Sequence, residues 1–248
     1  MKIFNIYTVE NQEMYCKEDS AMILAHLVDQ GKYDASNFAK CKYIIMDNGV
    51  YEHAQVSQSL SRLISLVKRS GIAVNEIVIP DVIGDYEKSK MLFEQSICTM
   101  QEYQLCFKFM YVTHAKTIEE LQESIVMVNT VSVKTNIQLV LGFPKHSALD
   151  RTSTEVINTL KGCTVPIHYL GIISSYSELL PVKSFIRSCD SVQLTYLTRD
   201  CSVADKDLIN KTREKPDIDL SIDKVNSVKL ALMRVVVNKE LKKNGLLR

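Results

Sequence analysis

Residues 43–49 read Tyr-Ile-Ile-Met-Asp-Asn-Gly, and residues 76–84 read Glu-Ile-Val-Ile-Pro-Asp-Val-Ile-Gly. Each stretch is a short apolar run that ends on an aspartate, with a glycine two or three residues later. Apolar residues that run continuously, without strict alternation, are typical of strands in a parallel sheet covered on both faces. Comparable runs recur along the chain and predict seven strands, at residues 3–9, 43–47, 76–81, 107–112, 137–141, 167–170 and 191–197.

Segments with helical periodicity separate these runs. Apolar residues three and four apart predict a helix with one buried face over residues 56–67 and another over residues 118–128. Thr117 and Glu120 have the spacing of a capping box at the start of the second helix. A last helix is expected to bury the stripe Ile222, Val225, Val228, Leu232 and Val235.

The alternation of strand and helix at intervals of roughly 30 residues predicts an α/β fold with a parallel sheet. A TIM-type (β/α)8 barrel, complete or incomplete, fits best, because such barrels have about 250 residues and this chain has 248. An open doubly wound sheet fits the same alternation. No linker or low-complexity tract interrupts residues 1–248, so we expect a single domain with C-terminal helices packed on the barrel.

Composition excludes several classes of protein. The chain has 46% hydrophobic residues and 30 Lys and Arg against 29 Asp and Glu, values of an ordinary globular protein and not of a disordered or collagen-like chain. Seven cysteines without a Cys-x-x-Cys pair predict free thiols, no structural zinc and a reducing compartment. With no signal-like or membrane-length apolar run, a cytoplasmic protein without membrane contact is expected.

Aspartates at strand ends are the main chemical signal. Asp47 and Asp81 each follow an apolar strand directly, and Asp190 borders the last predicted strand. In a barrel such residues converge at one end. Carboxylates that lie close together there repel one another, and their pKa values move apart. A pair of this kind suits chemistry at an anomeric carbon. Turn formation and helix capping are the structural alternative for each aspartate, and Asp85 is expected to cap the helix after it. His114 is left open between packing and the site.

Known motifs that bind cofactors or metals are missing from the sequence. No Gly-x-Gly-x-x-Gly or Walker loop is present, and the five histidines show no metal-ligand spacing, so we expect neither an organic cofactor nor a metal. Phosphate contact is expected from Lys145 and Arg199, each of which follows a predicted strand. The part of the chain at about 201–248, expected to be helical, holds 11 Lys and Arg against 7 Asp and Glu. Phosphate binding and an ordinary solvated helix face are equally good explanations of that excess.

Five short segments occur in the order found in one known family. Residues 45–52 resemble the Asp-Asn-Gly segment, and residues 78–85 the Leu-Pro-Asp-Val-Leu-Gly-Asp segment, of phage-type relatives of tRNA-guanine transglycosylase. Residues 141–144 and 168–172 are similar to the Gly-(apolar)-Pro and His-(apolar)-Leu-Gly segments that follow. Residues 190–191 resemble the Asp-Ser or Asp-Thr element that carries the nucleophile. The resemblance is to DNA 7-deazaguanine transglycosylases and spans most of the chain.

This resemblance implies a TIM barrel that exchanges guanine in DNA for a 7-deazaguanine base without breaking the strand. It assigns Asp190 as the nucleophile that attacks C1′ and forms a covalent intermediate, and Asp47 as the acid/base. Asp81 would accept hydrogen bonds from the edge of the base. The other residues that the matched segments place at the base are Asn48, Gly49, Gly142, His168 and Gly171.

Two further functions fit the same residues. A tRNA- or nucleoside-directed guanine transglycosylase would keep the barrel and change the acceptor. The tRNA enzymes carry a Cys-x-Cys-x-x-Cys…His zinc module that this chain lacks, which favours DNA. A non-catalytic, nucleic-acid-binding barrel subunit is the alternative from another class. Burial of Asp190 in an ion pair away from Asp47 and Asp81 would favour that alternative. If the chain is phage-encoded, it would act in the host cytoplasm.

Overall fold

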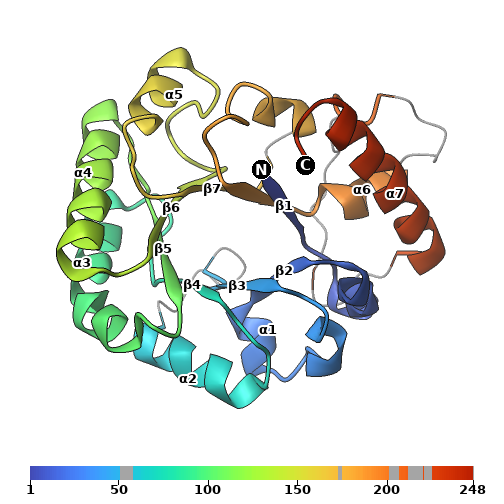
Figure 1. The fold of residues 1–248 in the computed structure, drawn as a ribbon, viewed down its shortest axis with the longest axis horizontal. Helices are drawn as coiled ribbons and strands as arrows, with labels where there is room; N and C mark the ends of the chain where they lie inside the picture. Colours follow the sequence, from blue (N-terminus) through green and yellow to red (C-terminus); the bar gives the residue numbers. More distant parts are fainter. Residues whose placement is uncertain (51–57, 173–174, 201–206, 212–219, 221–224, 248) are drawn as a thin grey trace.

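The computed structural model describes residues 1–50, 58–172, 175–200, 207–211, 220 and 225–247. Eight parallel strands form one sheet in the order β1-β8-β7-β6-β5-β4-β3-β2. They curl into the nearly closed ring seen in Figure 1, with β1 beside β2. The strands are β1 (Lys2–Asn5), β2 (Ser20–Leu24), β3 (Tyr43–Asp47), β4 (Glu76–Val78), β5 (Lys108–Val112), β6 (Leu139–Pro144), β7 (Ile167–Leu170) and β8 (Ser188–Ser191). The expected TIM-type barrel is confirmed, and the open doubly wound sheet is excluded.

Helices surround the ring of strands (Figure 1). The α-helices are α1 (Ala25–Asp29), α2 (Leu60–Ser70), α3 (Tyr86–Tyr103), α4 (Ile118–Thr135), α5 (Thr154–Leu160), α6 (Gln193–Asp200) and α7 (Ser227–Lys243). Three 3-10 helices, η1 (Val9–Lys17), η2 (Ala35–Phe38) and η3 (Tyr176–Leu179), lie in the connections. None of these helices is long and apolar enough to cross a bilayer.

Local sequence explains where several helices begin. The side chain of Thr117 accepts a hydrogen bond from the backbone N–H of Glu120, so the predicted cap of α4 is confirmed. Asp85 accepts from the backbone N–H of Lys88 at 3.1 Å and caps α3 as expected. On α2 the buried residues include the predicted Leu60, Leu63, Ile64 and Val67; Val56 lies outside the described residues.

Alternate residues of each strand face the inside of the barrel. The interior cluster is built from one or two apolar side chains on most strands: Phe4, Ile6, Met22, Ile45, Val78, Met110, Val112 and Val140. The intervening residues join the larger cluster between the strands and the helices. This period of two also decides which polar residues point inward at the strand ends.

Three strand predictions need correction. The sequence pattern missed β2, whose residues Ser-Ala-Met-Ile-Leu run into α1 without a turn residue. The first strand ends at Asn5 and not at Val9, where η1 begins. The predicted strand at 191–197 is wrong, because β8 ends at Ser191 and Gln193–Asp200 is helical. Its apolar residues Leu194 and Leu197 have helical spacing, and all side chains from Gln193 to Thr198 are buried.

The predicted buried stripe on the last helix is wrong at three of its five residues; Val225 is half-buried, and Ile222 lies outside the described residues. Helix α7 buries Leu230, Met233, Val237 and Leu241, while Val228, Leu232 and Val235 are 53–70% exposed. Both sets have helical spacing, and packing of α7 against α6 and η1 selects the first. Residues 201–206, 212–219, 221–224 and 248, which hold five of the 11 Lys and Arg and five of the 7 Asp and Glu of the C-terminal part, lie outside the described residues.

Candidate active site at the carboxyl ends of the strands

All three candidate aspartates lie at the same end of the barrel. Asp47 is the last residue of β3, and Asp190 is the third residue of β8. Asp81 is the third residue past the end of β4. The strands are parallel, so their carboxyl ends meet at one face. Residues two apart on a strand face the same side of the sheet. Asp47 therefore faces the same side as the inward-facing Ile45, and Asp190 faces the same side as Ser188. Asp190 is buried and paired with His168, at the same carboxyl end of the barrel as Asp47 and Asp81.

Asp190 is anchored through one of its two carboxylate oxygens. Its Oδ1 accepts a hydrogen bond from the backbone N–H of Gly171 at 2.9 Å, and it lies 3.0 Å from Nε2 of His168. The side chain is 9% exposed. Among the described residues, none donates a hydrogen bond to Oδ2 of Asp190.

His168 is buried beneath this carboxylate. The ring is fully buried, and its other nitrogen, Nδ1, lies 2.8 Å from Oγ of Ser188. His168 was expected to contact the substrate. Both ring nitrogens are instead engaged by protein groups, so the contact that the structure describes for this histidine is with the Asp190 carboxylate.

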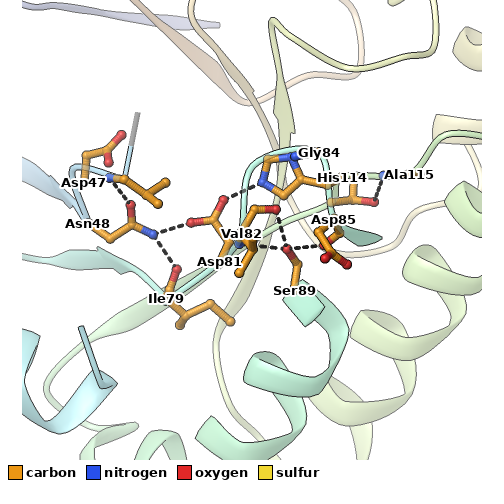
Figure 2. A network of polar contacts seen from close by, with 12 residues as sticks. Asp47, Asn48, Ile79, Asp81, Val82, Gly84, Asp85, Ser89, His114 and Ala115 are labelled. Carbon is orange, nitrogen blue, oxygen red and sulfur yellow. Dashed lines mark hydrogen bonds and ion pairs between the residues drawn. The ribbon is translucent and has the colours of Figure 1, made fainter. Parts of the chain in front are cut away.

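Asp81 is the centre of a second network, shown in Figure 2. Its Oδ1 accepts a hydrogen bond from Nδ2 of Asn48 at 2.5 Å, and its Oδ2 lies 2.5 Å from Nε2 of His114. The backbone N–H of Gly84 donates to Nδ1 of His114 at 3.3 Å. Because Nδ1 accepts a hydrogen bond, the ring proton is on Nε2, which donates a hydrogen bond to Asp81. The sequence left His114 undecided, and the structure places it in this network.

Asp47 lies on the other side of Asn48 from Asp81 (Figure 2). Its Oδ1 accepts a hydrogen bond from the backbone N–H of Gly49 at 2.7 Å, and Oδ1 of Asn48 accepts from Val50 at 3.0 Å. These two bonds fold the start of the loop after β3 into a tight turn. Asp47 is half-buried, which makes it the most accessible of the three aspartates.

Gly49 identifies a residue that sequence reasoning missed. Its φ is +75°, and a Cβ added there would lie 2.6 Å from Nδ1 of His26. The ring of His26, near the start of α1, therefore packs against Gly49 beside Asp47. His26 stands in an apolar segment, which predicts a packed helix residue; that prediction is confirmed, because His26 lies in α1, but the sequence does not indicate that α1 begins beside the site.

Gly171 brings Lys145 close to Asp190. Its φ is +64°, and a Cβ added there would lie 2.7 Å from Cδ of Lys145. The half-buried Lys145 stem thus lies over the residue whose N–H holds Asp190. At Gly142, an added Cβ would lie 3.0 Å from Cδ1 of Leu170 and 3.0 Å from Sδ of Met110. Gly142 leaves room for these interior side chains.

Arg199 is not at a strand end as expected. It lies in the last turn of α6, exposed, with its guanidinium 5.1 Å from the centre of the Tyr196 ring. The expectation rested on a strand at 191–197, which is a helix from Gln193 on. Of the two expected phosphate contacts, the structure places only Lys145 beside the aspartates.

Arg151 is a second residue that the sequence analysis missed. It is 1% exposed and donates to the backbone oxygens of Leu170 at 2.9 Å and Gly171 at 2.7 Å. It also donates to Phe143 O and lies 3.3 Å from Oε2 of Glu178. Arg151 thereby ties together the ends of β6 and β7 and the turn that carries Gly171. An arginine in a connecting segment has no sequence pattern that would predict such burial.

The described residues do not form an evident metal centre. Among the described residues, no three His, Cys, Asp or Glu side chains are grouped so that they could hold a metal ion. The candidate site consists instead of two Asp–His pairs, with Asp47 beside one of them and Lys145 beside the other.

Comparisons with known proteins support the fold. No protein-family model matches the chain, and no curated protein sequence matches it. A solved structure described as a structural study of a protein from Aquifex aeolicus VF5 is 12% identical with a TM-score of 0.52, over 98% of this chain and 92% of that one. An aldolase called QR15 is 10% identical with a TM-score of 0.49 over 77% and 88% of the two chains. A tryptophan synthase from M. tuberculosis is 11% identical with a TM-score of 0.48 over 99% and 92%. At this level of identity, the likeness to the Aquifex protein shows a shared barrel and leaves the chemistry to the residues of the site.

Proposed function

We propose that this protein is a base-exchanging transglycosylase that replaces guanine in DNA by a 7-deazaguanine base through a covalent Asp190 intermediate. The observation that supports this most is the asymmetry of Asp190. One of its oxygens is fixed by Gly171 and His168, and no described residue donates a hydrogen bond to the other. A nucleophile needs this combination of a fixed orientation and an unoccupied lone pair.

The reaction has two displacements at the same carbon. Oδ2 of Asp190 attacks C1′ of the nucleotide, and the C1′–N9 bond breaks with its electron pair going to guanine, which takes a proton from Asp47. The incoming 7-deazaguanine then loses its N9 proton to Asp47, and N9 attacks C1′. The C1′–O bond to Asp190 breaks and restores the carboxylate. One base leaves and one enters, so no redox partner is needed.

Asp81 is proposed to hold the edge of the base. Each oxygen of a carboxylate can accept two hydrogen bonds, and Asn48 and His114 use one on each oxygen. The remaining lone pairs can accept a ring N–H and an exocyclic amine. Because Asn48 and His114 fix the plane of the carboxylate in advance, the base meets an oriented acceptor.

DNA as the acceptor rests on the resemblance and on Lys145. A base inside a duplex must be extruded before its C1′ can be attacked, which costs a few kcal/mol. Contacts to the phosphates supply part of that energy. Lys145 lies over Gly171 beside the nucleophile, where it would meet the phosphate next to an extruded nucleotide. The absence of a zinc module in the sequence favours DNA over tRNA.

The test is a base-exchange assay. Purified protein is incubated with labelled 7-deazaguanine and duplex DNA, single-stranded DNA or unmodified tRNA. The variant Asp190→Asn removes the nucleophile while keeping its size. Asp19→Asn is the matched control, because that carboxylate is 79% exposed and pairs with the equally exposed Lys42. We expect label in DNA with the wild type and with Asp19→Asn, and none with Asp190→Asn.

The other outcomes separate the alternatives. Label in tRNA alone would keep the mechanism and refute the DNA acceptor. Equal incorporation by Asp190→Asn would refute the covalent intermediate. If no acceptor is labelled, DNA binding without a denaturant-stable adduct would identify a non-catalytic barrel.

A further inference from the structure

A buried chain of polar groups runs along the inside of the barrel to the candidate nucleophile. It begins at Glu76, fully buried at the start of β4, whose two carboxylate oxygens accept from Arg187 at 2.6 and 3.0 Å. Nε of the same arginine donates to Oγ of Ser188 at 3.0 Å. Ser188 lies 2.8 Å from Nδ1 of His168, and Nε2 of His168 lies 3.0 Å from Asp190. The chain thus connects the amino ends of the strands with the carboxyl ends.

The donors in this chain favour one arrangement of protons. Arg187 can only donate, so Oγ of Ser188 accepts its N–H, and Nδ1 of His168 is then the acceptor within reach of the hydroxyl proton. The ring proton of His168 is then on Nε2, where it is donated to Asp190. A proton on Nδ1 would leave the hydroxyl proton of Ser188 without an acceptor among the described residues. A neutral ring with its proton on Nδ1 would also place the lone pair of Nε2 next to the Asp190 carboxylate, where the two would repel each other.

Glu76 fixes the far end of the chain. Besides the two bonds from Arg187, it accepts a hydrogen bond from the hydroxyl of Tyr43 at 2.5 Å. The guanidinium is therefore held by a forked pair with both oxygens of one carboxylate, a geometry that restricts its rotation. With Arg187 held in place, its Nε points at Ser188, and the direction of every later hydrogen bond follows.

We propose that Glu76, Arg187 and Ser188 set the tautomer of His168, and that His168 is a positioning residue which orients the nucleophile Asp190 without touching substrate. This inference rests on the proposed function for its kinetic consequence only. The histidine holds Oδ1 in place, so that Oδ2 faces C1′. The serine acts through the histidine, at one further step from the reaction.

The tautomer is measured directly by ¹⁵N NMR on histidine-labelled protein, without reference to activity. The chain has five histidines, and His168→Gln identifies the signal of this ring by its loss. We expect an unprotonated Nδ1 and a protonated Nε2 in the wild type. Ser188→Ala removes the donor to Nδ1 and should bring a population with the proton on Nδ1. Ser188→Thr keeps the hydroxyl and should restore the wild-type pattern.

Exchange kinetics test the positioning role. Ser188→Ala is expected to lower kcat about tenfold, the effect of losing roughly one hydrogen bond in the transition state, while KM stays unchanged because Ser188 does not contact the base. Ser188→Thr should recover most of kcat. A rise in KM with kcat unchanged would contradict the positioning role.

The results separate this inference from the proposed function. An imidazolium, or a proton on Nδ1, in the wild type overturns the inference even if exchange is observed. If the wild type catalyses no exchange, the proposed function fails, and the tautomers of the wild type and of Ser188→Ala still decide whether the chain sets the state of His168. A wild-type tautomer and kcat in Ser188→Ala would also overturn the inference.

Discussion

Replacing Arg151 by methionine tests whether this buried guanidinium holds the carboxyl ends of β6 and β7 together. Methionine keeps most of the apolar stem and removes every donor. The change deprives the backbone oxygens of Phe143, Leu170 and Gly171 of their bonds from Arg151. It also deprives Glu178, whose side chain is 7% exposed, of its ion pair with Arg151.

The expected cost follows from burial. Removing one member of a buried ion pair typically costs about 3–5 kcal/mol, because the remaining charge stays in a poorly solvated position. Domains of ordinary stability unfold with roughly 5–15 kcal/mol, so the variant should remain folded while losing a large share of that margin. For a chain of this size, the corresponding fall in Tm is about 2–4 °C for each kcal/mol.

Urea unfolding followed by circular dichroism measures the loss. Arg62→Met is the matched control, since Arg62 pairs with Asp29 at 2.9 Å but its side chain is 53% exposed; exposed pairs contribute about 0–1 kcal/mol. A double-mutant cycle with Glu178→Gln isolates the pair itself. If Arg151→Met costs less than about 1 kcal/mol, or no more than Arg62→Met, the reasoning from burial is refuted.

Two further pairs of variants test the fold at single positions, each by urea unfolding. Met233→Ala on α7 should cost about 2–5 kcal/mol, because the side chain is fully buried. Leu232→Ala should change the free energy of unfolding by no more than about 0.5 kcal/mol, because that side chain is 53% exposed. A larger loss for Leu232→Ala than for Met233→Ala would support the stripe expected from sequence. Gly84→Ala should cost about 1–2 kcal/mol for its positive φ alone, since an added Cβ meets nothing within 4 Å. Gly49→Ala should cost roughly 1–3 kcal/mol more, because its Cβ would clash with a histidine ring, and equal costs would contradict that contact.

The barrel was predictable where apolar runs are long and bounded by turn residues. The strands at 43–47 and 167–170 match the prediction residue for residue. Strand β8 has the residues Ser-Cys-Asp-Ser, which carry no apolar run. It is a strand because β1 and β7 pair with it on both sides, and such tertiary pairing overrides local pattern.

Asp47 and Asp81 were predictable because the apolar strands before them are readable from sequence. Asp190 lies in β8, which has no such run, and was singled out by the resemblance; the partners of the three aspartates were not predictable. His168 meets Ser188 because these residues are opposite each other in the register of β7 and β8. His114 reaches Asp81 from the loop after the neighbouring strand. Arg151 comes from a connecting segment, where neither periodicity nor a turn motif indicates burial. Pairings of this kind depend on which strands are neighbours, and the period of a sequence does not contain that information.

The two Asp–His pairs differ in a way that supports different tasks for the two aspartates. In each pair Nε2 of the histidine faces the carboxylate, and Nδ1 contacts a neighbouring protein group. Asp81, however, accepts on both oxygens, whereas Asp190 accepts on one only. A carboxylate held at both oxygens is a rigid acceptor, because neither oxygen can move without breaking a hydrogen bond. A carboxylate held at one oxygen can attack with the other and keep its orientation. This difference follows from the contacts alone, and it favours Asp190 as the nucleophile and Asp81 as the binding group, in the same sense as the resemblance of the surrounding sequence.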